Sequence, residues 1–286
     1  MAWLSKLVLV LSLAALGGCY VPPGPVETDD PWLYTDPATG RSYYLYVPTT
    51  YNHNKPAPVI ISCHGTPPYD VARHHIDTWR GYGEKYGCII IAPTLDGTDG
   101  IFGDGPVSGM MVNERSILSI LSELSYKYNL DRSNIMITGF SGGGFPAYWV
   151  GLRHPDVFTV IVAQNCNFNR ANTDGWYPLA DAIKMPVMVF YGEHDPGTIV
   201  DQSRKAIDYL RSRGFRVDTD IIAGAGHDRH PEVAMSYFRK HWKKPRGTLH
   251  TSHSGRRTRK PIRPRTYRNP SETVELKGPR PPKPRR

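Results

Sequence analysis

The sequence predicts an α/β fold, with a mostly parallel central sheet flanked by helices and followed by a disordered basic tail. Two observations support this fold class. Short apolar runs alternate with stretches of helical spacing, and a chain of 286 residues that is 40% hydrophobic can bury one large core. Its longest apolar stretch, Leu7 to Leu16, is about half the length of a membrane-spanning helix. A transmembrane bundle and wholesale disorder are therefore excluded.

Strand and helix signals alternate from residue 31 to residue 242, which we expect to form one folded domain. The strand signals are short runs of Val, Ile and aromatic residues, and the helix signals are apolar residues three or four positions apart. In chain order, strands are expected at 41–47, 58–63, 88–92, 134–138, 158–162, 186–191 and 216–222, and helices at 71–86, 116–128, 145–152, 199–211 and 231–242. The runs without polar alternation indicate strands that are buried on both faces, as in parallel sheets. Functional side chains of such a sheet gather at the carboxyl ends of its strands.

Residues 1–19 have the pattern of a secretory signal, with Lys6 before the apolar run and small residues after it. The segment Leu16-Gly-Gly-Cys19 resembles the lipobox of bacterial lipoproteins. This resemblance implies that Cys19 is diacylated and that the mature chain begins there. Residues 20–30 are rich in proline and suit an extended tether. We expect a lipid-anchored protein of the cell envelope, at the outer membrane or cell surface if the cell has two membranes. The alternative is an ordinary secretory peptide with an incidental cysteine.

The strand at 134–138 leads directly into Gly139-Phe140-Ser141-Gly142-Gly143 and then into a helix. Gly-x-Ser-x-Gly between a strand and a helix is the pattern of a nucleophile elbow, in which a sharp turn presents the serine at the sheet edge. Ser141 is therefore the candidate nucleophile. The alternative is a glycine turn that carries a solvated serine.

A serine hydroxyl needs a base, so a histidine and a carboxylate are expected on later strand ends. Asp195 follows the sixth predicted strand and His227 follows the seventh, in a glycine-rich loop. We prefer Asp195 to Glu193 and Asp201 because it lies in the turn just after its strand and a short carboxylate holds an imidazole rigidly. We expect His230 to be a surface residue.

The candidate oxyanion hole follows the second predicted strand, in Cys63-His-Gly-Thr66-Pro-Pro68. Proline carries no N–H, so the donor in this loop is the amide of Thr66, with Gly65 as the alternative. The Gly142 amide, next to the nucleophile, is expected to be the other donor. We expect the His64 ring to be buried and hydrogen-bonded beneath the loop.

Together these segments resemble the α/β-hydrolase superfamily and, within it, the polyhydroxybutyrate-depolymerase-like esterases, which overlap with feruloyl and acetylxylan esterases. The resemblance runs from about residue 41 to residue 241 and rests on segments 58–65, 128–143, 154–158, 192–195 and 226–227. It implies the α/β-hydrolase fold and a serine esterase that uses Ser141, His227 and Asp195, with no metal or organic cofactor. The chain departs from the family at Gly142, where alanine or a similar residue is common.

The expected reaction is two-step acyl transfer on a small-molecule or polymeric ester. Candidate acyl-pocket residues are Trp79, Met110, Met111, Phe168 and Trp176. One alternative is a serine peptidase like the prolyl oligopeptidases. It is less favoured because the roughly 20 residues between Cys19 and the first strands leave no room for a propeller domain. Another is an inactive hydrolase fold that serves as a lipid-anchored binding protein.

The net charge of +9 is unevenly distributed. Residues 243–286 hold 15 Lys/Arg and 2 Asp/Glu, whereas residues 1–242 hold 20 and 24. The tail also has eight prolines and few large apolar residues, so we expect it to be disordered. It suits binding to an anionic envelope polymer, or it only keeps the protein soluble; nucleic acid is the least expected partner. Cys63, Cys88 and Cys166 match no zinc spacing and are expected to be buried free thiols.

Overall fold

The computed structural model describes residues 30–99, 107–170, 182, 184–243 and 262. Residues 1–31 form a separate unit, and the account below concerns the unit that begins at Trp32. Its strands are β1 (Leu33–Thr35), β2 (Ser42–Tyr46), β3 (Ala57–Cys63), β4 (Ile89–Pro93), β5 (Leu130–Ser141), β6 (Val160–Cys166), β7 (Val187–Gly192) and β8 (Val217–Ile222). Its helices are α1 (Ala72–Tyr86), α2 (Val107–Lys127), α3 (Gly144–Arg153), α5 (Gly197–Ser212) and α6 (Pro231–Lys240).

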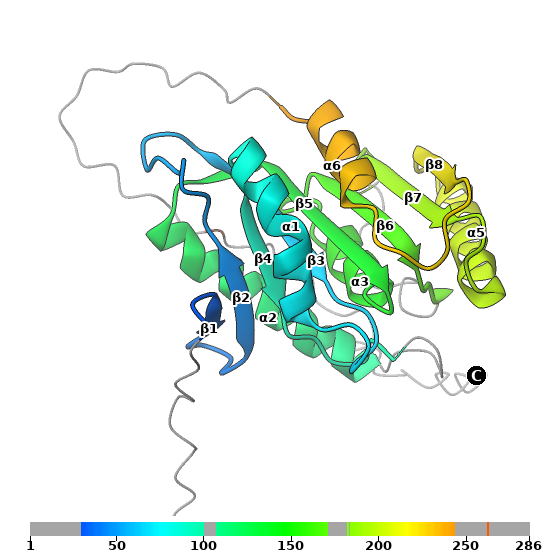
Figure 1. The fold of residues 1–286 in the computed structure, drawn as a ribbon, viewed down its shortest axis with the longest axis horizontal. Coiled ribbons are helices and arrows are strands. Elements are labelled where there is room, and N and C mark those ends of the chain that lie inside the picture. The colour runs from blue at the N-terminus through cyan, green and yellow to red at the C-terminus, as the bar shows by residue number, and fades with distance from the viewer. Residues whose placement is uncertain (1–29, 100–106, 171–181, 183, 244–261, 263–286) are drawn as a thin grey trace, which may run out of the picture. The chain divides into compact units, whose positions relative to one another are not determined.

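The described strands form one eight-stranded sheet in the order β1-β2-β4-β3-β5-β6-β7-β8 (Figure 1). β1, β2 and β4 pair antiparallel, and every pair from β4 to β8 is parallel. Helices α1 and α6 cover one face of the sheet, and α2, α3 and α5 cover the other (Figure 1). Parallel strands need such crossover helices, which explains why β3 to β7 are buried on both faces.

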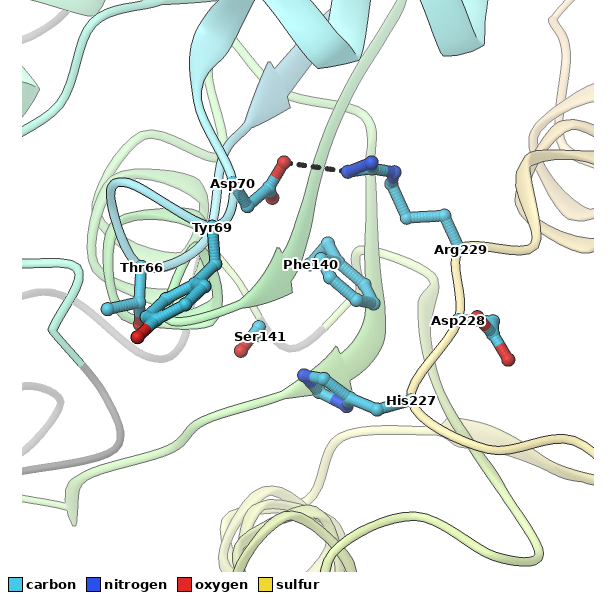
Figure 2. Close-up of a pocket in the computed structure, with 8 residues that line it drawn as sticks. All are labelled: Thr66, Tyr69, Asp70, Phe140, Ser141, His227, Asp228 and Arg229. Carbon is cyan, nitrogen blue, oxygen red and sulfur yellow. Dashed lines mark hydrogen bonds and ion pairs between the residues drawn. The ribbon is translucent and has the colours of Figure 1, made fainter.

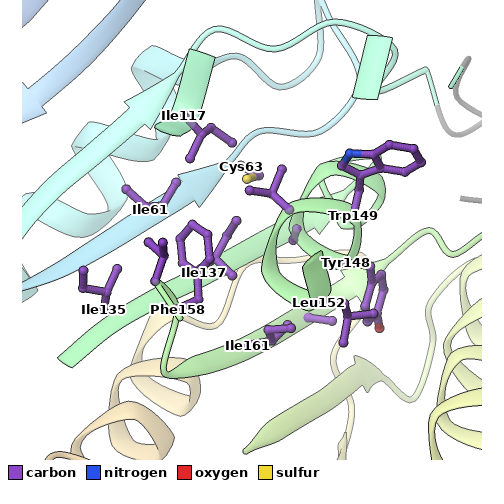
Figure 3. Packing of buried hydrophobic residues seen from close by; sticks show 14 of the residues in the cluster. Ile61, Cys63, Ile117, Ile135, Ile137, Tyr148, Trp149, Leu152, Phe158 and Ile161 are labelled. Carbon is purple, nitrogen blue, oxygen red and sulfur yellow. The ribbon is translucent and has the colours of Figure 1, made fainter. Parts of the chain in front are cut away.

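Two apolar clusters hold the helices against the sheet. On the α1 and α6 side, Trp79 and Phe238 pack with strand residues such as Ile90. On the other side, Figure 3 shows Leu152 of α3 beside Ile161 of β6, and both belong to one buried cluster with Trp149 and Ile137. This close packing makes the carboxyl end of β5 a rigid platform.

The predicted α/β fold with a mostly parallel sheet flanked by helices is confirmed, and every predicted strand and helix exists. β1 was not predicted, and three predicted elements are clearly longer than expected. α2 begins at Val107 and not at residue 116, β5 runs from Leu130 to Ser141 and not from 134 to 138, and β6 runs on to Cys166. The apolar run ends before β6 does because Gln164 is buried as a polar residue and donates from Nε2 to Thr138 Oγ1 at 2.7 Å. A buried polar side chain with a partner inside the sheet breaks the apolar pattern without ending the strand.

Some sequence expectations lie outside the described residues, namely the signal at 1–19, the tether up to residue 29, and the tail at 244–261 and 263–286. One residue of the predicted tail, Ile262, is described, and it lies in the core of the folded unit. This residue is 4% exposed and belongs to the main apolar cluster, and its N–H donates to Ser125 Oγ at 3.1 Å. A single isoleucine among prolines and arginines carries no periodicity, so the sequence pattern could not reveal this contact.

Cys63, Cys88 and Cys166 are buried and free, as predicted. Burial raises the pKa of the Cys88 thiol to about 12, so the group is uncharged at neutral pH. Among the described residues, no helix is both long enough and apolar enough to cross a membrane.

Candidate active site

Ser141 ends β5 and has a left-handed backbone conformation, with φ of 52°. A non-glycine residue in this region is strained, and the surrounding structure must hold it there. The flanking glycines permit the turn. A Cβ at Gly139 would lie 2.3 Å from the Gly143 carbonyl oxygen, and one at Gly143 would lie 2.2 Å from the Cys63 carbonyl oxygen. The structure thus has the strand–turn–helix geometry expected of a nucleophile elbow.

Gly142, where the sequence departs from the common alanine, has a steric explanation. A Cβ at this position would lie 1.8 Å from the Thr98 carbonyl oxygen and 3.2 Å from Thr66 Oγ1. Because Thr98 and Thr66 occupy the space of a methyl group, only glycine fits without a shift of the backbone.

Asp195 and His227 form the second part of the site. His227 Nδ1 donates to Asp195 Oδ1 at 2.6 Å, and the Asp195 side chain is fully buried. The other carboxylate oxygen, Oδ2, accepts from the Gly192 amide at 2.7 Å and from Asn165 Nδ2 at 2.6 Å. With its Nδ1 proton held by the carboxylate, the ring has Nε2 available as a base, a tautomer assigned from this hydrogen-bond geometry.

Figure 2 shows that the His227 ring turns one nitrogen toward Ser141. The ring packs against Phe140, with ring centroids 4.8 Å apart and planes 32° apart. The side chain of Phe140 therefore supports the imidazole from the strand that carries the nucleophile.

The other two carboxylates weighed from sequence lie elsewhere. Glu193 is exposed and accepts from the Gly224 amide at 2.8 Å, and Asp201 is exposed and pairs with Lys205. Through its bond to Gly224, the Glu193 side chain contacts the turn that precedes His227 in the chain. Asp195 is thus the carboxylate that contacts the histidine.

The loop after β3 lies against the nucleophile, because a Cβ at Gly65 would be 3.1 Å from Ser141 Cβ. The Gly65 amide donates to Asp70 Oδ2 at 2.7 Å, so it is already occupied. Among the described residues, the amides of Thr66 and Gly142 donate to no protein acceptor. These two N–H groups are therefore free to bind an oxyanion, whereas the alternative donor Gly65 is not.

His64 is buried beneath this loop, as predicted. Its Nε2 accepts from the Leu95 amide at 2.9 Å, which leaves Nδ1 to donate to the Gly65 carbonyl at 2.8 Å. Burial lowers the pKa of His64 to about 4, so the ring is neutral at physiological pH. The ring thus positions the loop and takes no part in proton transfer.

The sequence pattern did not reveal a network around Asp70. This buried carboxylate accepts from His75 Nε2 at 2.9 Å and from Arg229 Nη1 at 2.6 Å, in addition to Gly65. Burial opposes its ionisation, but the His75 hydrogen bond, the Gly65 amide and the Arg229 charge together hold the pKa of Asp70 well below its usual range. Asp70 therefore links the loop after β3, through the Gly65 amide, to the loop that carries His227, through Arg229. No local motif relates these residues, which are up to 159 positions apart.

A cavity of about 500 Å³ opens in front of Ser141 (Figure 2). Its lining residues are Thr66, Tyr69, Asp70, Phe140, Ser141, His227, Asp228 and Arg229. The acyl pocket expected from sequence is wrong for four residues. Trp79 and Met110 are buried in the core, Met111 is exposed, and Phe168 lines a different cavity. The fifth, Trp176, lies outside the described residues, as does the candidate lipidation site Cys19.

No group of three or more metal-ligating side chains occurs among the described residues. The site brings together a strained serine, a His–Asp pair and two amides without protein acceptors, which are the kinds of group that nucleophilic acyl transfer uses.

The sequence model of the prolyl oligopeptidase family (Peptidase_S9) matches residues 115–181, which include the elbow. The chain is 29% identical to dipeptidyl-peptidase 5 of Porphyromonas gingivalis, over 75% of this chain. It is 26% identical to acetylxylan esterase A of Emericella nidulans, over 60% of each chain. A ferulic acid esterase from Anaeromyces mucronatus superimposes with a TM-score of 0.55 and 16% identity, over 72% of this chain and 86% of that one. The chain has the α/β-hydrolase fold.

The chain therefore has both a peptidase and an esterase among its relatives. It spans 37% of the length of the dipeptidyl-peptidase 5 sequence and 60% of the acetylxylan esterase sequence. Only a part of the peptidase is therefore matched, and the likeness to the ferulic acid esterase concerns the fold.

Proposed function

We propose that this hydrolase cleaves carboxylic esters through an acyl-enzyme intermediate on Ser141, with His227 as the general base and Asp195 as its orienting acid. The observation that carries the proposal is the 2.6 Å hydrogen bond between His227 Nδ1 and Asp195 Oδ1 beside a strained serine. That bond fixes the tautomer in which Nε2 is the proton acceptor, and Figure 2 shows one ring nitrogen turned toward the serine, which is the arrangement that activates a hydroxyl.

In the first half-reaction, Ser141 Oγ attacks the ester carbonyl carbon and its proton passes to His227 Nε2. The N–H groups of Thr66 and Gly142 stabilise the oxyanion. The tetrahedral intermediate then collapses, the C–O bond to the alcohol breaks, and His227 returns its proton to that leaving group. In the second half-reaction a water molecule attacks the acyl-enzyme by the same path and releases the acid.

A fluorophosphonate probe tests the nucleophile, because it reacts only with an activated serine. We expect labelling of the wild type and none of Ser141→Ala, with Ser133→Ala as a serine control outside the cavity. Hydrolysis of p-nitrophenyl acetate should follow the same pattern. Labelling that persists in a folded Ser141→Ala protein would overturn the assignment, and a wild type that neither labels nor hydrolyses would favour the inactive binding protein.

Peptide hydrolysis is the second candidate, and the match to dipeptidyl-peptidase 5 and to the prolyl oligopeptidase family favours it. Amide hydrolysis uses the same serine, histidine and oxyanion donors, so the catalytic geometry suits either bond. A comparison of kcat/KM on short-chain p-nitrophenyl esters, acetylated xylan and methyl ferulate with that on dipeptidyl p-nitroanilides separates the two. Faster turnover of the anilides would replace the esterase proposal.

We further propose that Cys19 carries the lipid that holds the enzyme at the cell envelope. The support is the lipobox-like sequence at 16–19. Metabolic incorporation of an alkyne fatty acid should label the wild type and not Cys19→Ala. Equal labelling of both proteins would refute the anchor.

The basic segment 243–286 is proposed to bind an anionic envelope polymer such as lipopolysaccharide, on the support of its 15 Lys/Arg and 2 Asp/Glu. Binding of this kind weakens as salt increases. Retention on an anionic matrix should therefore be salt-dependent and should be lost when the 15 Lys/Arg of residues 243–286 are replaced by Gln, a change that keeps Ile262 in place. Retention that survives this replacement would assign it to the catalytic unit.

A further inference from the structure

Asn165 combines two features that rarely occur together in a residue outside a functional site. It lies near the end of β6, is fully buried, and has φ of 51°, which places it in the left-handed region. Asn tolerates this conformation better than most residues. Because strained backbone is costly, it is retained where the surrounding contacts enforce it.

The side-chain amide of Asn165 bridges the two loops that hold the catalytic pair. Its Nδ2 donates to Asp195 Oδ2 at 2.6 Å and to the Gly226 carbonyl, next to His227, at 3.2 Å. Its Oδ1 is buried and has no hydrogen-bond partner among the described residues. Only the Nδ2 group of this side chain therefore has hydrogen-bond partners, and an N–H donor is what the Asp195 carboxylate needs. The reverse amide orientation would set an oxygen against the Asp195 carboxylate.

We propose that Asn165 is a positioning residue, which holds Asp195 and the loop that carries His227 in fixed positions relative to Ser141. This inference rests on the proposed function, since it assigns Asn165 a role in that reaction. The backbone of the same strand end reaches the nucleophile, because the Asn167 amide donates to the Ser141 carbonyl at 2.9 Å. The end of β6 and the residue after it thus contact Asp195, Gly226 beside His227, and Ser141.

Two substitutions separate the amide donor from the backbone conformation. Asn165→Gly keeps the left-handed backbone accessible and removes both hydrogen bonds. Asn165→Asp keeps the size and the backbone preference but sets a second carboxylate against Asp195. Gln164→Ala is the matched control, because Gln164 is also a buried amide of β6, but it bonds to Thr138 and not to the triad.

We expect kcat for p-nitrophenyl acetate to fall about 10- to 100-fold in Asn165→Gly, since a small displacement of the base has effects of that size. KM should stay within about 2-fold of wild type, because substrate binding does not involve Asn165. Gln164→Ala should keep kcat within about 3-fold. If Asn165 were merely structural, Asn165→Gly and Gln164→Ala would both lower thermal stability, and Asn165→Gly would not show a lower kcat at an unchanged KM.

The pH profile of Asn165→Asp supplies a second readout. Two adjacent carboxylates share one proton at low pH, and that proton restores a donor to Asp195. The kcat of Asn165→Asp relative to wild type should therefore decline from about pH 6 to pH 9. The titratable groups facing Asp195 are His227 and the Cys166 thiol, which is uncharged because burial raises its pKa well above the usual value. Asp228 and the Asp70–Arg229 pair lie beyond His227 around the cavity.

The His227 Nδ1 proton gives a low-field NMR signal, which reports the His227–Asp195 hydrogen bond and requires no substrate. Its exchange with water should be at least about tenfold faster in Asn165→Gly than in wild type, because the His227 loop has lost its tie. Wild-type kcat together with an unchanged signal in Asn165→Gly would overturn the inference. If the wild type itself neither hydrolyses esters nor reacts with fluorophosphonate, the proposed function fails, and the NMR comparison still decides whether Asn165 positions the pair.

Discussion

Gly142→Ala tests whether the loops after β3 and β4, through Thr66 and Thr98, dictate the residue that follows Ser141. The added Cβ would lie 1.8 Å from the Thr98 carbonyl oxygen, and ordinary contacts begin at 3.4 Å. Either the Thr98 backbone or the elbow must therefore move by about 1.6 Å. The same carbonyl accepts the Thr66 hydroxyl at 2.8 Å, so its displacement also releases the residue that supplies an oxyanion donor.

The size of the effect follows from these contacts. A buried Thr66 hydroxyl that loses its partner costs about 1–3 kcal/mol, and overpacking of a closely packed site costs about as much again. The free energy of unfolding should fall by about 2–6 kcal/mol in total. Displacement of one oxyanion donor should reduce kcat about 100-fold.

The assay measures kcat and KM for p-nitrophenyl acetate together with urea unfolding of the same preparation. Gly197→Ala is the control, because a Cβ at this exposed glycine has no atom within 4 Å. Alanine is common at the corresponding position of the esterases that the sequence resembles, so the outcome is informative. The steric reasoning would be refuted by a Gly142→Ala protein whose kcat is within about 2-fold of wild type and whose free energy of unfolding is within about 1 kcal/mol of it.

Three further predictions concern stability. The partners of Asp70 hold its pKa down, so its contribution to the free energy of unfolding is present above the unfolded pKa of about 4 and is lost as the pH falls below that value. Asp70→Asn should therefore lower the free energy of unfolding at pH 7 and make it fall less steeply between pH 7 and acid pH, as measured by urea unfolding at each pH. Gly81→Ala in α1 meets no atom within 4 Å and should stabilise by about 0.5–1 kcal/mol in the same assay, and a decrease would contradict the helix assignment. Ile262→Asp should destabilise by about 2 kcal/mol, whereas an unchanged urea midpoint would show that this contact contributes nothing.

Local signals were sufficient for the sheet, the helices and the candidate triad. Strand and helix periods depend on near neighbours in the chain, and the elbow is a motif of five consecutive residues whose steric demands are local. Asp195 and His227 could be placed because parallel strands end at one edge of a sheet. The acyl-pocket residues could not be placed, because aromatic and Met side chains suit a core as well as a pocket, and Trp79 and Met110 lie in the core.

The sequence by itself determined the α/β architecture, the glycine turn at Ser141 and the order of serine, carboxylate and histidine. Only the tertiary structure decided which amides remain free for an oxyanion, why position 142 is glycine, and that Asn165 and Asp70 tie the catalytic loops together. Each of these depends on atoms from distant segments meeting within hydrogen-bond or van der Waals distance, such as Asp70 and Arg229, which are 159 positions apart. No local pattern encodes such contacts, because they arise from the packing of the whole sheet.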